Sequence, residues 1–275
     1  MSVEVVFTKG FGNNLFQYTF GRILAEFHSV PFFHPPIFNI PGKQVNIPRD
    51  HVYHVKTDWK RSDTETKQFY RTLFQERRHF LLNDYFEDFT LYLPHEYRIQ
   101  SWFPRVTIKN REDLVVHFRA GDALLYKDNI VNFPTVEEWK NILDQIQYKQ
   151  LYVVTDSTQF TPVNKEYIDI KINEICKQRR RSNRDKFMSN EECTEVTNKY
   201  INMFNEYNCK WVHHDDFLDD FNYLRQFDKI LIGPSTFSWW ACFLSDASEK
   251  YVYKAWRKGK GDRNKNLGQI PWIQW

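Results

Sequence analysis

The sequence predicts an α/β protein whose second half forms a parallel, doubly wound sheet. In that half, short apolar segments typical of buried strands alternate with segments that carry apolar residues at helical spacing. A chain of 275 residues is also long enough for two domains that each bury a core. We therefore expect two domains, 1–110 and 111–275, which meet in the polar stretch 109–113.

The first domain is expected to begin with a strand, a glycine-containing loop and a helix. Residues 3–7 form a short apolar run, and the apolar spacing of 15–27 predicts a helix. The loop between them, 10–14, contains glycines that allow backbone to approach a ligand closely, although a turn without a ligand is the simpler alternative. Irregular structure with short strands is expected over 30–60, and a helix over 64–85.

The second domain shows the clearest alternation of strands and helices. Its expected strands are 114–118, 150–154, 211–214, 229–233 and 250–253. Its expected helices are 134–146, 217–227 and 237–245. The first of these helices has a start signal, because Thr135 is a capping residue and Glu138 follows it at the capping-box position.

Two candidate ligand-binding segments follow expected strands of the second domain. The carboxyl ends of the strands in such a sheet open into the crevice where ligands bind. In His117–Asp122, the guanidinium of Arg119 is suited to two phosphate oxygens and to the charge of a leaving diphosphate; a structural ion pair between Arg119 and Asp122 is the alternative. In Gly233–Ser238, backbone N–H and hydroxyl groups at a helix start are suited to phosphate; an ordinary helix cap is the alternative.

The charge distribution argues against nucleic acid as a partner. The formal net charge is +3, and the basic residues are dispersed except at 177–181. That cluster lies in a charged, helix-prone segment, 164–208. A solvated helical face or loop is the simpler interpretation and a surface that binds an anionic or polymeric acceptor is the alternative, so we assign the segment no role. No stretch approaches the roughly 20 apolar residues of a membrane span, so a cytoplasmic location is expected.

Acidic pairs of the kind that hold a divalent metal occur at 215–216 and 219–220. The second pair falls in a helical pattern and is expected at the surface or at a helix cap. We therefore expect metal-independent chemistry, in which Arg119 and helix dipoles supply the positive charge.

Three motifs, in order, resemble those of glycosyltransferase family 11, the α-1,2-fucosyltransferases. The segment KGFGNNLFQYTFGRILAE resembles the family's G-x-G-N-x-x-F-Q-Y, VVHFRAGD resembles H-x-R-R-G-D, and LIGPSTFSWWACFL resembles N-S-[ST]-F-S-W-W. The tail QIPWI is similar to the I-P-x-x-W-I ending of bacterial members. The resemblance covers most of the chain except 30–105 and 164–208.

The resemblance implies a GT-B fold, with two Rossmann-like domains and a cleft between them: an acceptor-side domain first and a nucleotide-sugar-binding domain second. It also implies an inverting, metal-independent transfer of L-fucose from GDP-fucose to a sugar hydroxyl of a glycan, without a cofactor. The implied catalytic residues are Arg119, Asp122 and His117. The implied donor-binding residues are Gly10, Gly12, Asn13, Asp156, Ser235, Thr236, Phe237 and Ser238.

The chain departs from the family pattern at two places. Ala120 replaces the second arginine of H-x-R-R-G-D, and Gly233-Pro234 replaces Ala-Asn before the serine pair. These departures keep two alternatives open: another donor, UDP-xylose or a nucleotide-linked rhamnose, and a non-catalytic glycan-binding module. The general base is also open among Asp122, His34 and His117.

Overall fold

We analysed a computed structural model of the chain, which describes residues 1–8, 10–44, 52–56, 63–119, 133–155, 188–254 and 267–275. The chain divides into two compact units, Met1–Arg105 and Val106–Lys258. In the C-terminal segment, residues 267–270 belong to the first unit and Pro271–Trp275 to the second. Both units are of the α/β class, and every pairing between their named strands is parallel, consistent with Rossmann-like folds.

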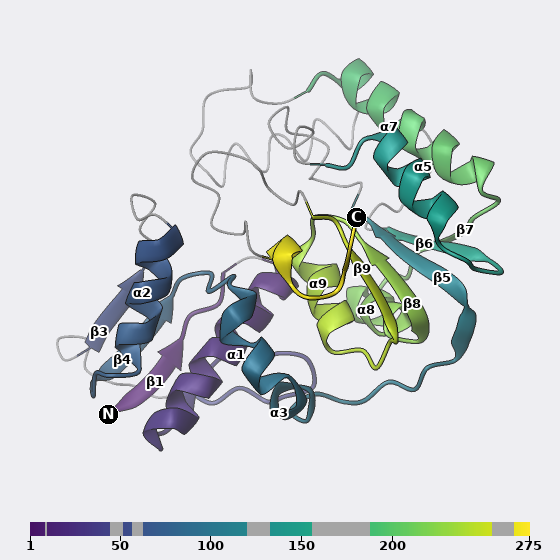
Figure 1. Cartoon of the computed structure of the whole chain (residues 1–275). Helices are drawn as coiled ribbons and strands as arrows, with labels where there is room; N and C mark the ends of the chain where they lie inside the picture. Colours follow the sequence, from purple (N-terminus) through teal and green to yellow (C-terminus); the bar gives the residue numbers. More distant parts are fainter. Residues whose placement is uncertain (9, 45–51, 57–62, 120–132, 156–187, 255–266) are drawn as a thin grey trace. The chain divides into compact units, whose positions relative to one another are not determined.

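The first unit contains a sheet of order β2-β1-β4-β3 (Figure 1). Its strands are β1 Ser2–Val5, β2 Phe32–Phe33, β3 Val52–Lys56 and β4 His79–Asn83. Its helices are α1 Phe11–His28, α2 Asp63–Leu73 and α3 Glu96–Gln100, and short 3-10 turns lie at Phe89–Leu91, Leu93–His95 and Leu267–Gln269. Helix α1 connects β1 to β2 and α2 connects β3 to β4, so the strand–helix–strand connection expected of a parallel sheet occurs twice.

The helix predicted over 64–85 is wrong in its second part. Helix α2 ends at Leu73, and residues 79–83 form strand β4 in the centre of the sheet. Phe80 and Leu82 of this strand are buried, and the strand pairs with both β1 and β3. Because this pairing joins segments far apart in the sequence, local apolar spacing did not reveal it.

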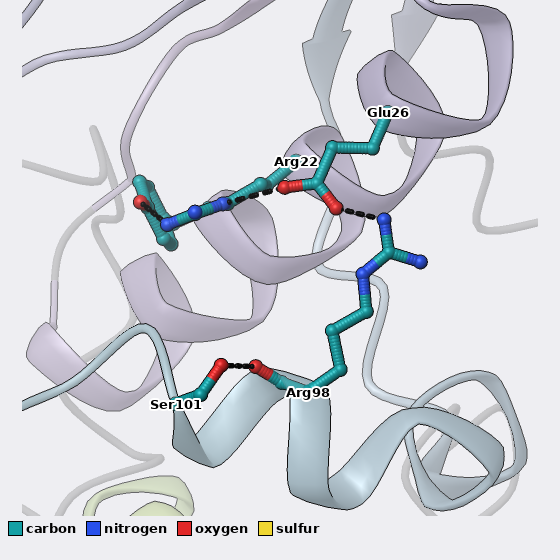
Figure 2. A network of polar contacts seen from close by, with 5 residues as sticks. Arg22, Glu26, Arg98 and Ser101 are labelled. Atoms are coloured by element: carbon teal, nitrogen blue, oxygen red, sulfur yellow. Dashed lines mark hydrogen bonds and ion pairs between the residues drawn. The ribbon is translucent and has the colours of Figure 1, made fainter.

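A polar network attaches α3 to α1 within the first unit (Figure 2). Glu26 accepts from Arg22 Nε at 2.9 Å and also binds the guanidinium of Arg98 on α3. Arg22 donates in addition to the hydroxyl of Tyr18 at 2.9 Å and lies over the ring of Trp102, 4.2 Å from its centroid. These side chains are partly exposed, so we interpret the network as fixing the position of α3 and not as a reactive site.

The second unit contains a sheet of order β10-β9-β8-β5-β6-β7 (Figure 1). Its strands are β5 Asn110–Phe118, β6 Leu151–Thr155, β7 Lys210–Val212, β8 Phe227–Ile232, β9 Glu249–Val252 and β10 Ile273–Gln274. Its helices are α5 Val136–Gln145, α7 Asn190–Glu206, α8 Phe217–Leu224 and α9 Thr236–Phe243. The predicted strand and helix types of this half are confirmed, and β10 is a strand that the sequence patterns did not indicate. The interpretation of 164–208 as a solvated segment is wrong for α7, because this helix buries Met203 and Phe204 in the core.

Alternation along β5 decides which side chains face which helices. Leu114, Val116 and Phe118 belong to the apolar core that α5 and α7 form with one face of the sheet. Because successive strand residues point to opposite faces, His117 lies on the other face, where its ring contacts Phe237 of α9. A histidine in the centre of the sheet therefore projects away from the apolar core on the α5 side.

The capping box predicted at the start of α5 is confirmed. Glu138 N donates to Thr135 Oγ1 at 3.1 Å, and Thr135 N donates to Glu138 Oε2 at 2.8 Å. We expect Thr135→Ala to lower the free energy of unfolding by about 1 kcal/mol, because an N–H group of the first turn loses its acceptor. Urea denaturation measures this loss, and Thr135→Ser, which keeps the acceptor, is the matched control. Equal stability of the alanine and serine variants would contradict the prediction.

Candidate functional site at the carboxyl edge of the second sheet

The candidate site lies where two neighbouring strands of the second unit end. Strands β5 and β8 are paired in parallel, with His117 opposite Ile232, so both strands end at the same edge of the sheet. Arg119 follows β5 directly, and the turn 233–235 follows β8 and leads into α9. The structure thereby brings together two motifs that are more than a hundred residues apart in the sequence.

His117 is the most buried titratable group of this site. Its side chain is 4% exposed, its ring centroid lies 5.3 Å from that of Phe237, and its Nδ1 atom has no hydrogen-bond partner. Burial, followed by the positive charge of Arg119, lowers the pKa of His117 to about 3. The imidazole is therefore neutral at physiological pH, and it contributes no positive charge toward a bound phosphate.

The turn after β8 presents the amino end of α9 at the same edge. Ser235 is the N-cap residue with extended backbone, and its side chain makes no capping hydrogen bond. The carbonyl of Ser235 accepts from Trp239 N at 2.9 Å and from Ser238 Oγ at 3.1 Å. The Ser238 hydroxyl is thus bound within the helix, whereas the Ser235 hydroxyl is not used to cap it. Because an uncapped helix start attracts anions, this end of α9 suits a phosphate group.

The ring of Phe237 connects the two motifs through packing. It contacts His117 on β5 and also Phe221 on α8, with a centroid distance of 5.3 Å to each. Thr236 and Ser235 are buried beside it, 8% and 3% exposed. The first turn of α9 is consequently held against both β5 and α8, which fixes its position relative to the strand that carries Arg119.

A second polar cluster lies further along the same edge, after β6 and β7, and sequence reasoning missed it. His214 donates from its backbone N to Asp220 Oδ1 at 3.1 Å, and its Nδ1 lies 2.7 Å from the same oxygen. His213 donates from Nδ1 to the carbonyl of Thr155 at 3.2 Å, and its Nε2 atom is buried without a partner. The sequence feature that could have indicated this cluster is the pair of histidines that directly follows the strand, within 211–214.

The expectation that the acidic pair 219–220 lies at the surface or at a cap is wrong for Asp220. Asp216 caps α8 by accepting from Leu218 N, and Asp220, one turn later, is only 5% exposed. Burial raises the pKa of Asp220, while its contacts with His214 and His213 oppose that shift. Asp219 is exposed as expected. The local pattern did not distinguish the two carboxylates because the inner face of α8 is set by packing on the sheet.

The glycine motif of the first unit forms the start of α1. Helix α1 begins at Phe11, four residues earlier than expected, so Gly12 and Asn13 belong to its first turn. Gly10 precedes the helix with a φ of 98°, a conformation that glycine adopts without strain. A hairpin-like turn at this position is thereby excluded. The start of α1 lies at the carboxyl edge of the first sheet, as expected for a segment that follows β1.

Gln17 fixes this segment and was not recognised from the sequence. Its side chain is fully buried; its Oε1 accepts from Thr8 N at 3.0 Å, and its Nε2 donates to the carbonyl of Asp84 at 3.0 Å. It therefore joins the segment after β1 to the segment after β4.

His34, a candidate base, follows β2; its Nδ1 donates to Pro35 O at 2.7 Å, and burial lowers its pKa.

Comparisons of the chain with models of protein families, with curated proteins and with solved structures found no match. The resemblance to family 11 therefore remains a prediction from the motifs and their order. Two of the expected site residues, Asp122 and Asp156, and the basic cluster 177–181 lie outside the described residues.

Neither a metal site nor a membrane helix is found in the part of the chain that the structure describes. No group of three or more His, Cys, Asp or Glu side chains there is arranged to hold a metal ion. None of its helices is both long and apolar enough to cross a bilayer.

Proposed function

We propose that the protein is a nucleotide-sugar-dependent glycosyltransferase of the GT-B type whose donor diphosphate binds between Arg119 and the amino end of α9. The observation that carries this proposal is the adjacency of β5 and β8, which places both groups at one edge of the sheet. A guanidinium fork and a helix start are two different ways of binding phosphate oxygens. The presence of two phosphate-binding groups at one edge of the sheet favours a diphosphate over a single small anion.

The second polar cluster is suited to the nucleoside of the donor. Strand β7 lies two strands beyond β5 in the order β8-β5-β6-β7, a separation of about 10 Å at the usual strand spacing. The imidazoles of His213 and His214, which follow β7, and the carboxylate of Asp220, which contacts His214, are the polar groups of this cluster. In this arrangement the nucleoside extends along the edge of the sheet, and the sugar extends from the other end of the diphosphate.

The reaction that this site supports is a single displacement with inversion. A hydroxyl of the glycan acceptor attacks the anomeric carbon, a general base takes the hydroxyl proton, and the bond from that carbon to the diphosphate oxygen breaks so that the nucleoside diphosphate leaves. Arg119 and the backbone donors at the start of α9 stabilise the negative charge that develops on the diphosphate. We propose GDP-fucose as the donor, on the basis of the three motifs described above.

Calorimetric titration with GDP, GDP-fucose, UDP and UDP-xylose, in buffer with a chelator, tests the proposal. We expect the guanine pair to bind more tightly and binding to persist in the chelator, because Arg119 and α9 provide the positive charge. Preference for the uracil pair would keep the diphosphate site and change the donor. Absence of binding by all four would overturn the proposal. A protein that binds the donor but neither hydrolyses it nor transfers its sugar to an acceptor would be a non-catalytic glycan-binding module.

A further inference from the structure

Trp139 lies against the turn that begins the candidate phosphate site. It belongs to the first turn of α5, is 1% exposed, and sits beside Gly233, the first residue after β8. A Cβ atom added to Gly233 would lie 3.3 Å from Cζ2 and 3.6 Å from Cη2 of the indole. The contact with Cζ2 is tighter than an ordinary van der Waals contact, so a side chain at position 233 would require a shift of a few tenths of an ångström.

The backbone of Gly233 does not itself require glycine. Among the glycines that the structure describes, Gly10 has a positive φ and Gly233 does not, so alanine can adopt the backbone conformation of Gly233. The contact with Trp139, and not the backbone conformation, is therefore what limits a side chain at position 233.

Trp139 is confined on its other sides. Its ring centroid lies 5.6 Å from that of Phe204 on α7 and 4.8 Å from that of Trp275, the last residue of the chain. Trp275 is itself fixed to β9, because its N donates to Val252 O at 3.2 Å and its carbonyl accepts from Lys254 N at 2.9 Å. An indole held by α7 and by the C-terminal segment has little room to move away from the turn.

We propose that Trp139 is a positioning residue, which sets the turn 233–235 and thereby the start of α9 relative to Arg119. This inference rests on the proposed function, since it assigns Trp139 a role in donor binding. Its consequence is that a methyl group at position 233 forces the turn and the indole apart by a few tenths of an ångström, because the added Cβ would lie 3.3 Å from Cζ2. Removing the indole edge that touches Gly233 relieves the same displacement.

The test is a double-mutant cycle on GDP binding, measured by calorimetry for wild type, Gly233→Ala, Trp139→Phe and the double variant. We expect Gly233→Ala to weaken GDP binding by about tenfold in the wild-type background and by less than about threefold in the Trp139→Phe background, because phenylalanine lacks the Cζ2–Cη2 edge. A purely structural role of Trp139 would not produce this rescue.

Ile142→Val is the matched control, because Ile142 is a buried core residue of the same helix. We expect it to lower the melting temperature and to leave GDP affinity unchanged. Equal losses from Gly233→Ala in both backgrounds, or no loss in either, would overturn the positioning role while the proposed function stands. A wild-type protein that binds none of the nucleotides tested above would overturn both.

Discussion

Replacing Arg119 by alanine is expected to lower kcat/KM for glycosyl transfer by about 30- to 1,000-fold, equivalent to about 2–4 kcal/mol of transition-state stabilisation. The reason is electrostatic: in the proposed reaction negative charge grows on the departing diphosphate, and Arg119 is the cationic side chain that directly follows β5 at the edge shared with α9. Arg119→Lys should recover only part of the loss, because an ammonium keeps the charge but not the two-pronged geometry of the guanidinium.

Arg111→Ala is the matched control for this experiment. Arg111 lies on the same strand as His117, is exposed, and is near the opposite end of β5. The Arg111→Ala substitution removes the same charge from the protein without removing a group at the candidate site. Steady-state kinetics of the three variants with a fixed acceptor measure the effect. An Arg119→Ala enzyme with nearly wild-type kcat/KM would remove Arg119 from the chemistry.

Acidification is expected to destabilise the second unit through His117. Its folded-state pKa is about 3, below the value of about 6.5 in an unfolded chain, so below pH 6.5 the unfolded chain binds the proton and the folded protein does not. This residue's contribution to the free energy of unfolding is complete above pH 6.5. It then falls by about 1.4 kcal/mol per pH unit as the pH decreases toward 3.

The contribution is measured as the difference between the pH-stability curves of wild type and His117→Phe, obtained by urea denaturation from pH 7.5 to 4.5. Phenylalanine keeps an aromatic ring beside Phe237 but does not titrate, so the difference isolates the proton. We expect the wild type to lose stability relative to the variant as the pH falls below 6.5. His54→Gln, which replaces an exposed histidine of β3, is the comparison variant. Parallel curves for wild type and His117→Phe would contradict the assigned pKa.

The sequence was sufficient to predict some residues of the candidate site and not others. Arg119 and the segment 233–238 could be identified because each follows a strongly apolar segment, and in the structure β5 and β8 end directly before them. Asp220 could not, because its burial depends on which face of α8 packs on the sheet. His213 and His214 gain their contacts from Thr155 and Asp220, which belong to other elements.

The sequence by itself determined the α/β class, the strand and helix types of the second unit and the capped start of α5, because apolar spacing and capping are local properties. The tertiary structure alone decided that β5 lies beside β8, that residues 79–83 form a central strand, and that Trp139 fills the space beside Gly233. Each of these depends on contacts between segments distant in the chain, where burial and packing outweigh local preference.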